Sequence, residues 1–156
     1  MSQYTLITGA SSGIGESLAR EYAESGHDLI LTARRTDRLE KLAAELRERH
    51  GRSVEVVSAD LGDPSGVAEL ADTVIARDWG LQGLVNNAGF GDSGPFAKRP
   101  REKQLAMIQV NVTALVDLTH RLLPLLQKAK APFILNVASV AAFQAGPNMG
   151  VYYASK

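Results

Sequence analysis

Apolar runs alternate with amphipathic stretches along the whole chain. Five runs are rich in aliphatic residues and end at glycine, asparagine or small polar residues, as buried strands do; they cover residues 4–7, 28–33, 53–58, 83–89 and 132–138. The stretches between them carry apolar residues at three- and four-residue spacing, which predicts helices over residues 16–25, 36–50, 64–78 and 101–130. This alternation predicts one α/β domain with helices on both faces of a parallel sheet, in three α/β/α layers.

The same spacing predicts which residues form the apolar face of each helix. For the first, second and fourth helices they are, in turn, Ile14, Leu18 and Tyr22; Leu39, Leu42 and Leu46; and Leu105, Ile108, Val112, Leu115 and Leu122. The fourth helix also contains Asn111 among its apolar positions and Pro124 near its end. Proline removes a backbone hydrogen bond inside a helix, so we expect this helix to kink or open locally.

A glycine-rich turn separates the first strand from the first helix. The apolar run breaks at Thr8, and Gly9, Gly13 and Gly15 follow. Gly9 permits a tight turn, Gly13 allows a pyrophosphate to approach the backbone, and Gly15 lets the helix pack closely on the strand. The free N–H groups and positive dipole end of the helix would then face the phosphates. The turn favours a dinucleotide site, with an ordinary strand–helix turn as the alternative.

Two further strand ends bear on the choice of cofactor. In a dinucleotide-binding fold, an acidic residue after the second strand contacts the ribose and selects NAD. Ala33 and Arg34 occupy that place here, and a guanidinium suits the 2′-phosphate of NADP; a basic start to the next helix is the alternative. Asp60, after the third strand, either accepts a hydrogen bond from the adenine amino group or only caps a turn. The residues therefore favour NADP over NAD.

Composition narrows the class of function. The 156 residues are 45% hydrophobic, enough for one core, and 17 basic side chains balance 17 acidic ones. This neutral balance gives no indication of a nucleic-acid or membrane partner. The absence of cysteine excludes disulfide and thiol chemistry, and we expect a cytoplasmic location. No metal site is predicted, because the histidines are scattered at His27, His50 and His120.

Several polar residues lie where a parallel sheet binds ligands. The segment 86–89 is a turn of asparagine and small residues that leaves room for a ligand ring. Ser139 follows the fifth strand, at the edge where open parallel sheets bind ligands. Tyr152 and Lys156 are four positions apart and share one face of a helix. Each has a structural alternative: a tight turn, a satisfied buried amide at Asn111, or surface packing of the Tyr–Lys pair.

Together these segments resemble the short-chain dehydrogenase/reductase superfamily. The matching motifs occur in the family's order: Thr8-Gly-Ala-Ser-Ser-Gly-Ile-Gly15, Asn86-Asn-Ala-Gly89, Asn111, Ser139 and Tyr152-Tyr-Ala-Ser-Lys156. The resemblance covers the chain from end to end and implies a Rossmann-type, doubly wound sheet with strand order 3-2-1-4-5. It also implies hydride exchange between NADP(H) and a small carbonyl compound or secondary alcohol. The implied cofactor contacts are Gly9, Ser11, Ser12, Gly13, Ile14, Gly15, Arg34, Asp60, Leu61, Asn87, Ala88, Gly89, Tyr152 and Lys156.

The resemblance assigns the catalytic roles as well. Tyr152 would donate a proton to the alkoxide that hydride addition leaves. The ammonium of Lys156 would favour the ionised phenolate and hold the nicotinamide ribose. Ser139 would hydrogen-bond the carbonyl oxygen, and Asn111 would hold a water that relays protons to Lys156. Tyr153 is the competing acid, but it does not match the family's register.

The chain departs from the family in length. The family's chains continue beyond the lysine through the rest of that helix, two further strands and the substrate-binding segment, whereas this sequence stops at Lys156. We therefore expect the cofactor-binding part of a longer reductase. So short a final helix is costly to nucleate, so Tyr152 and Lys156 are expected to fray. Residues 133–137 are expected to form an exposed apolar edge strand.

Other functions stay open at this point. A non-catalytic NADP-binding fragment or interaction module would bind NADPH without turnover. A methyltransferase shares the glycine-rich first turn, but it usually needs an acidic ribose contact where Arg34 stands, and it would not explain Tyr152 and Lys156. The family usually associates through the long helix and the helix that contains the lysine, so a homo-oligomer is one possibility for the full-length form. Nothing in the sequence identifies the substrate.

Overall fold

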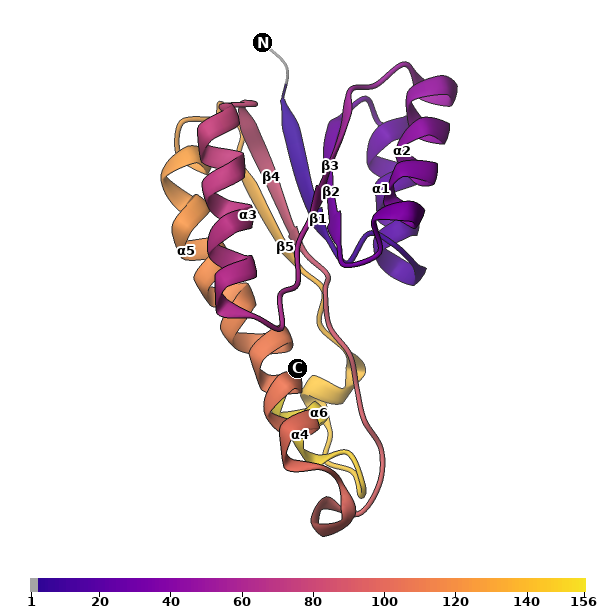
Figure 1. Ribbon diagram of the computed structural model, residues 1–156, viewed down its shortest axis with the longest axis vertical. Helices are drawn as coiled ribbons and strands as arrows, with labels where there is room; N and C mark the ends of the chain where they lie inside the picture. The colour runs from indigo at the N-terminus through magenta and orange to yellow at the C-terminus, as the bar shows by residue number, and fades with distance from the viewer. Residues whose placement is uncertain (1–2) are drawn as a thin grey trace.

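The computed structural model describes residues 3–156, which contain a five-stranded parallel sheet (Figure 1). The strands lie in the order β3-β2-β1-β4-β5, which confirms the predicted Rossmann-type topology. Every neighbouring pair of strands is parallel. The strands are β1 (Tyr4–Thr8), β2 (Asp28–Ala33), β3 (Val54–Ser58), β4 (Leu81–Asn86) and β5 (Phe133–Asn136).

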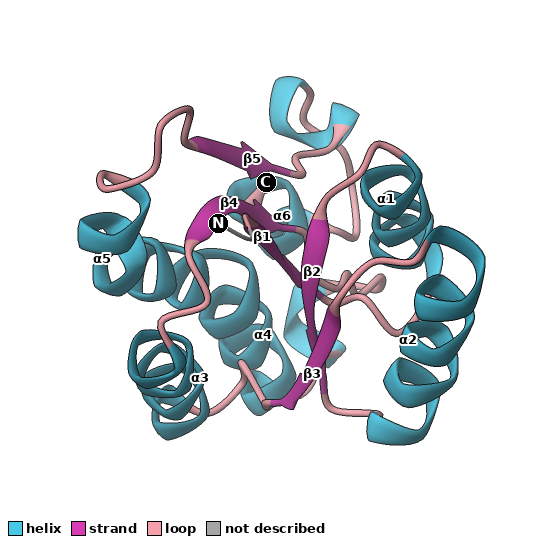
Figure 2. Ribbon diagram, turned by 90° about the horizontal axis from the view of Figure 1, so that it is seen from above, coloured by secondary structure: helices cyan, strands magenta, loops and turns pink. Residues whose placement is uncertain are grey.

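Helices cover both faces of the sheet. Viewed from above, α1 and α2 lie on one side of it, and α3, α4 and α5 lie on the other (Figure 2). No helix within residues 3–156 is both long and apolar enough to cross a membrane. The helices are α1 (Gly13–Glu24), α2 (Thr36–His50), α3 (Pro64–Arg77), α4 (Arg101–Ile108), α5 (Ala114–Leu126) and α6 (Gly150–Ser155), with 3₁₀ turns η1 (Phe96–Lys98) and η3 (Val140–Phe143) and a π-helical turn η2 (Gln109–Thr113).

Alternate side chains of the central strands supply two hydrophobic cores, one on each face of the sheet. On β1, Leu6 joins the core beneath α3 and α5, and Ile7 joins the core beneath α1 and α2. Leu84 and Val85 of β4 divide in the same way. Because both faces are buried, these strands are nearly continuous apolar runs, and this is why the sequence revealed them.

Helix α1 packs on the sheet mainly through its smallest side chains, and its predicted apolar face is confirmed only in part. Ile14 is 61% exposed, while Leu18 and Tyr22 are only partly buried at the margin of the core. The helix lies so close to the turn after β1 that larger side chains would not fit beneath it. The buried positions are Gly15, Ala19 and Ala23.

The predicted helix over residues 101–130 does open locally, at the π-helical turn η2 between α4 and α5, which contains Asn111. The opening is not at the proline, because α5 continues through Pro124. Its predicted apolar face is wrong for the first half, because Leu105, Ile108 and Val112 are 46%, 41% and 38% exposed. The residues that are buried recur at ordinary three- and four-residue spacing, but they include Asn111 and Ala114, which a search for large aliphatic side chains passes over. The buried residues are Met107, Asn111, Ala114, Leu118, Leu122 and Leu126.

The carboxyl-terminal part of the chain forms one edge of the sheet and a short helix below it. Ile134 and Leu135 of β5 are 41% and 36% exposed, which confirms the expected apolar edge strand. The residues from Tyr152 onward were expected to fray. Instead, residues 152–155 are helical and form the latter part of α6, which begins at Gly150. Helix α6 packs beside α4, at the lower end of the molecule (Figure 1).

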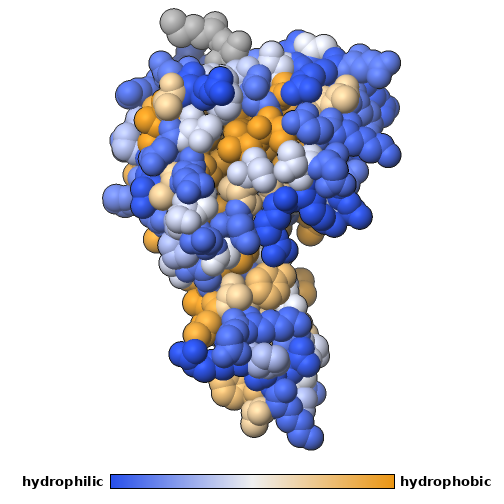
Figure 3. All heavy atoms as spheres, in the orientation of Figure 1, coloured by the Kyte–Doolittle hydropathy of each residue, from blue (hydrophilic) through white to orange (hydrophobic). Residues whose placement is uncertain are grey.

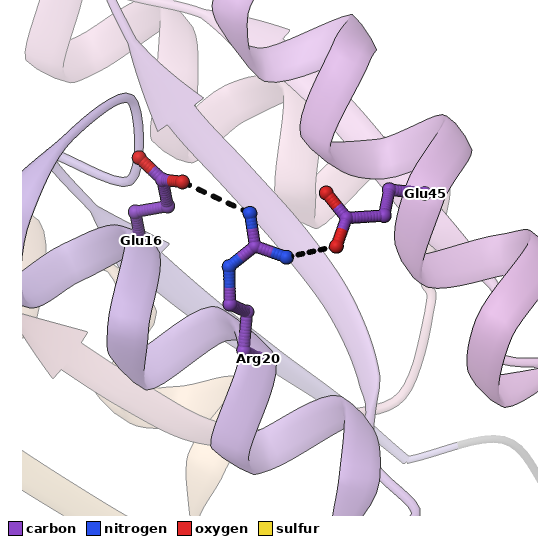
Figure 4. Close-up of polar contacts among 3 residues, drawn as sticks. All are labelled: Glu16, Arg20 and Glu45. Atoms are coloured by element: carbon purple, nitrogen blue, oxygen red, sulfur yellow. Dashed lines mark hydrogen bonds and ion pairs between the residues drawn. The ribbon is translucent and has the colours of Figure 1, made fainter.

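An ion-pair cluster joins α1 to α2 at the surface. The guanidinium of Arg20 lies between the carboxylates of Glu16 and Glu45 (Figure 4). Hydrogen bonds to Glu45 and to Glu16 raise the pKa of Arg20, and the Arg20 bond lowers the pKa of Glu45. Since all three side chains are at least about a third exposed, the cluster orients the helices more than it stabilises them.

Candidate active site

A cleft of about 800 Å³ lies at the carboxyl ends of the strands. Segments that follow all five strands line it, together with α6. Figure 3 shows the molecule narrowing between the larger upper body and a smaller lower part that contains α4 and α6. Most of the predicted cofactor residues meet in this cleft: Gly9, Ser11, Ser12, Ile14, Arg34, Asp60, Leu61, Asn87, Ala88, Gly89, Tyr152 and Lys156.

The glycine turn has the geometry that its sequence predicted. Gly9 and Gly13 have φ values of 66° and 60°, in the left-handed region that favours glycine. A Cβ on Gly13 would meet nothing within 4 Å, so the backbone there is open to a ligand, whereas a Cβ on Gly15 would lie 2.4 Å from Gly9 O. Ser12 precedes α1 but makes no side-chain cap. The first N–H groups of α1 are therefore not capped by it and can receive an anion.

Asn87 fastens the turn after β4 to the glycine turn. Its Nδ2 donates to Thr8 O at 2.9 Å, while Thr8 Oγ1 accepts from the backbone N–H groups of Asn87 and Ala88 at 3.0 and 2.9 Å. The side chain of Asn87 thus bonds the end of β1, a segment far away in sequence, whereas its backbone N–H also donates to Val85 O in its own segment. These bonds hold two walls of the cleft together.

Two arginines and two serines form a polar end of the cleft. Arg34, the predicted NADP determinant, lines the cleft as expected. Arg35 lines it too, and its Nη2 donates to Ser11 Oγ at 3.0 Å and to Ser12 Oγ at 2.8 Å. Arg35 was not among the predicted site residues, although its place beside Arg34 was a sufficient signal. Two guanidinium groups and two hydroxyls provide donors that suit a phosphate.

Asp60 makes the turn contact that was the alternative to an adenine contact. Its Oδ1 accepts a hydrogen bond from Gly62 N at 2.9 Å. The residue is nevertheless exposed and lines the cleft beside Leu61. A carboxylate has a second oxygen that can accept another bond, so the turn contact leaves the adenine role open.

Asn111 is 5% exposed, and its amide holds two other segments of the site. Its Oδ1 accepts from Phe90 N at 3.0 Å, and its Nδ2 donates to Phe90 O and to Ser155 Oγ, each at 2.9 Å. Because both N–H bonds are used, the amide cannot donate to a water. The amide oxygen lies near the amine of Lys156: both are 3.1 Å from the point where a Cβ on Gly89 would stand.

The two adjacent tyrosines point to different places. Tyr152 lines the cleft, and a Cβ on Gly91 would lie 3.1 Å from its ring. The hydroxyl of Tyr153 lies instead against Gly146, 2.4 Å from a Cβ position there, and Tyr153 does not line the cleft. Geometry therefore favours Tyr152 over Tyr153 as the residue that meets a ligand.

Lys156 and Ser139 flank the end of β5. Lys156 lines the cleft, and its Nζ donates to Val137 O at 3.0 Å. Ser139 follows β5 as predicted, but it does not line the cleft, and its Oγ accepts from Ala141 N at 3.1 Å to cap η3. Its neighbour Ala138 does line the cleft. A hydroxyl that only accepts from the cap keeps its own proton free to donate.

A buried carboxylate holds the segment after β4. Asp92 is 6% exposed, and it accepts from Arg99 at 2.5 and 2.6 Å and from Lys103 at 2.8 Å. The bonds from Arg99 and then Lys103 hold the pKa of this carboxyl well below its ordinary value, at about 2. No local sequence pattern indicates these bonds, because Arg99 follows η1 and Lys103 lies in α4. Within residues 3–156 no cluster of His, Cys, Asp or Glu could hold a metal ion.

Comparison with known proteins agrees with this architecture. A family model described as short chain dehydrogenase matches residues 3–156. Sulfoacetaldehyde reductase 2 of Chromohalobacter salexigens is 39% identical over 162 residues, and the alignment covers 100% of this chain and 62% of that protein. 11-beta-hydroxysteroid dehydrogenase 1A of Arabidopsis thaliana is 40% identical over 152 residues, which cover 97% of this chain and 43% of that protein.

Solved structures show the same correspondence. A short-chain dehydrogenase from Sphingobium yanoikuyae in complex with NADPH has a TM-score of 0.91 and 38% identity, covering 100% of this chain and 60% of its own. L-sorbose reductase from Gluconobacter frateurii, complexed with NADPH and L-sorbose, has a TM-score of 0.92 and 32% identity, covering 99% and 59%. The chain thus spans about 60% of the length of several relatives and less of others. By its sequence motifs, its sheet order and this match over residues 3–156, the chain belongs to the short-chain dehydrogenase family.

Proposed function

We propose that this protein is an NADP(H)-dependent oxidoreductase that interconverts a carbonyl compound and a secondary alcohol. The observation that carries the proposal is the meeting of Tyr152 and Lys156 with the glycine turn in one cleft. The solved relatives that hold NADPH, and the reductases named above, support the same cofactor and reaction class. The two arginines at the polar end favour NADP over NAD.

The cleft fits a dinucleotide phosphate by its own chemistry. The open backbone at Gly13 and the start of α1 would receive the pyrophosphate. Arg34 and Arg35 would bind the 2′-phosphate, with Ser11 beside them. At the other end of the cleft, Lys156 would hydrogen-bond the nicotinamide ribose.

Four side chains would carry the proton chemistry. Bound NADPH supplies a hydride from its nicotinamide ring. Tyr152 donates the proton that the resulting alkoxide requires, and it accepts one when the reaction runs toward the ketone. The ammonium of Lys156 favours the phenolate form of Tyr152. Ser139 turns its free hydroxyl proton to the carbonyl oxygen and stabilises the charge that develops there.

The water of the proton relay would lie in the space beside Gly89. Asn111 Oδ1 and Lys156 Nζ both border this space. A water there would accept from Lys156, while the amide of Asn111 keeps the surrounding segments in position. Both N–H bonds of Asn111 Nδ2 go to Phe90 and Ser155. Asn111 would therefore bind the water only as an acceptor, through one of its own oxygens.

Two adjacent tyrosines allow a matched test of the proposal. NADPH binding and NADPH oxidation across a panel of small ketones and aldehydes are measured for the protein at its natural length, for Tyr152→Phe and for Tyr153→Phe. We expect Tyr152→Phe to retain NADPH binding and to lose a factor of about 10² to 10⁴ in kcat. Tyr153→Phe should keep most of the turnover.

Two outcomes would contradict the proposal. Equal turnover in Tyr152→Phe and the wild type would show that Tyr152 is not the proton donor. NADPH binding by the wild type with no oxidation of any carbonyl in the panel would instead support a non-catalytic NADP-binding module.

A further inference from the structure

Ser155 lies between the two residues to which the proposed function gives the chemistry, and it is almost buried, with 9% exposure. It stands three positions after Tyr152 and one before Lys156 on helix α6. On a helix, residues three apart are offset by about 60° and successive residues by about 100°, so Ser155 lies beside Tyr152 and is turned away from Lys156, with its hydroxyl against Asn111. It does not line the cleft itself.

The hydroxyl of Ser155 makes a directed pair of hydrogen bonds. Its Oγ accepts from Asn111 Nδ2 at 2.9 Å and donates to Tyr152 O at 2.9 Å. A serine hydroxyl has one proton, and the amide nitrogen of Asn111 can only donate. The direction of both bonds therefore follows from the donors present, and Ser155 connects η2 to the backbone of the proposed proton donor.

The other side of Asn111 extends this connection to the wall of the cleft. Its amide pairs with both backbone groups of Phe90. Phe90 and Gly91 line the cleft, and Gly91 lies against the ring of Tyr152. Hydrogen bonds thus connect the segment after β4, through Asn111 and Ser155, to the backbone of Tyr152. The ring of Tyr152 packs on that same segment.

Bonds from other segments reach the part of α6 next to Lys156. Within the helix, Tyr153 N donates to Met149 O at 3.0 Å, while Lys156 N donates to Tyr153 O at 3.4 Å. From outside it, Asn111 Nδ2 donates to Ser155 Oγ, and Val137 O accepts from Lys156 Nζ. These two bonds hold α6 against η2 and against the end of β5.

We propose that Ser155 is a positioning residue that sets the rotation of α6, so that Tyr152 and Lys156 face the cleft together. The structural part of this inference stands on the hydrogen bonds of Asn111 and Ser155 alone. Its consequence for turnover rests on the proposed function. Ser155 touches neither cofactor nor substrate and acts through its neighbours.

The test compares Ser155→Ala with Ser155→Thr, which keeps the hydroxyl. Thr119→Val is the matched control, because Thr119 Oγ1 also accepts from an asparagine amide, that of Asn86, at 3.0 Å but away from the cleft. Three quantities are measured on each variant: hydrogen exchange of the α6 amides, NADPH affinity, and kcat and KM for a carbonyl substrate.

We expect Ser155→Ala to accelerate exchange of the Tyr153 and Lys156 amides, and to lower kcat by about 10- to 100-fold because small displacements of reacting groups are costly. KM for the carbonyl should change less than kcat. Ser155→Thr should recover part of both losses. Thr119→Val should leave α6 exchange and kcat at their wild-type values, even where it lowers the melting temperature.

The readouts separate failure of this inference from failure of the proposed function. Unchanged α6 exchange in Ser155→Ala would overturn the positioning role, whether or not the protein is active. Faster exchange with unchanged kcat in an active protein would overturn it as well. A wild type without turnover would contradict the proposed function, and the exchange data would then decide the role of Ser155.

Discussion

The two ends of the cleft are built in different ways. The end that would bind phosphate consists of a turn and a helix start that follow one another directly in the chain, and its shape depends on backbone conformation at Gly9, Gly13 and Gly15. The end that carries Tyr152 and Lys156 is joined by side-chain hydrogen bonds between segments 19 to 44 residues apart.

This difference indicates how each end can fail. A backbone cradle fails through steric change, because Gly9 and Gly15 leave no room for another atom. A hydrogen-bonded cluster fails through the loss of single polar atoms, because each loss leaves a buried partner without its bond. Mutations at the first end should therefore affect binding and stability together, and mutations at the second should affect geometry first.

The largest effect is expected from a single added carbon at the phosphate end. In Gly15→Ala the new Cβ would stand 2.4 Å from Gly9 O, a backbone atom that cannot turn aside. We expect a loss of about 1 to 3 kcal/mol in the free energy of unfolding and NADPH binding too weak to measure by titration. Thermal unfolding and NADPH fluorescence would record the two effects.

Gly83→Ala is the control for that variant. Its Cβ would come within 2.3 Å of the ring of Phe133, a clash of similar size away from the cleft. It should lower stability while NADPH affinity stays near the wild-type value. If Gly15→Ala bound NADPH as tightly as Gly83→Ala, the glycine turn would not be the phosphate site.

A smaller effect is expected from the arginines, and it would sharpen the description of the same end. Arg34→Ala removes a charged donor for the 2′-phosphate, so NADPH should bind about 10- to 100-fold more weakly, while NADH binding changes little. Arg35→Ala should act in the same direction. Arg38→Ala, on the exposed face of α2, is the control. Equal losses for NADPH and NADH would place Arg34 elsewhere than at the 2′-phosphate.

The smallest effect concerns pH and the segment beside Tyr152. The Arg99 and Lys103 bonds lower the pKa of Asp92 from 3.8 to about 2. The ionised carboxylate therefore stabilises the folded state above about pH 4, and this contribution is lost as the pH falls toward 2. The melting temperature of Asp92→Asn should lie below that of the wild type at neutral pH, and the gap should close over this range.

A matched variant tests whether the bonds of Asp92 to Arg99 and Lys103 stabilise the fold more than an exposed ion pair does. Asp117→Asn breaks an exposed ion pair with Arg121 on α5, which should contribute little. If the difference in melting temperature between the wild type and Asp92→Asn stayed constant from pH 6 to pH 2, the charge of Asp92 would not stabilise the fold.

The sequence predicted the phosphate end better than the catalytic end, for physical reasons. Buried parallel strands and glycine turns are local patterns, so the sheet order and the roles of Gly9 and Gly15 followed from them together with the family resemblance. The predicted face of α1 was only partly right, because close packing selects alanine and glycine there, which periodicity of large side chains overlooks. The same preference for large aliphatic residues selected Leu105 and Val112, which are exposed, in place of Asn111 and Ala114.

Side-chain partners across long separations were beyond the reach of the sequence. Nothing local indicates that Asn111 pairs with Phe90 and Ser155, or that Asp92 is held by Arg99. The motif placed Tyr152 and Lys156 one turn apart, but the bonds that orient them come from other segments. Their catalytic roles, with that of Ser139, stay predictions until turnover is measured.

The most direct test of the account follows the hydride itself. The protein at its natural length is incubated with NADPH that carries deuterium at both C4 positions of the nicotinamide and with a panel of ketones, and the alcohol products are analysed by mass spectrometry. The account predicts one deuterium on the former carbonyl carbon in the wild type, and the same product formed about 10²- to 10⁴-fold more slowly in Tyr152→Phe. Alcohol without deuterium, or NADPH oxidation with no alcohol formed, would contradict hydride transfer in this cleft.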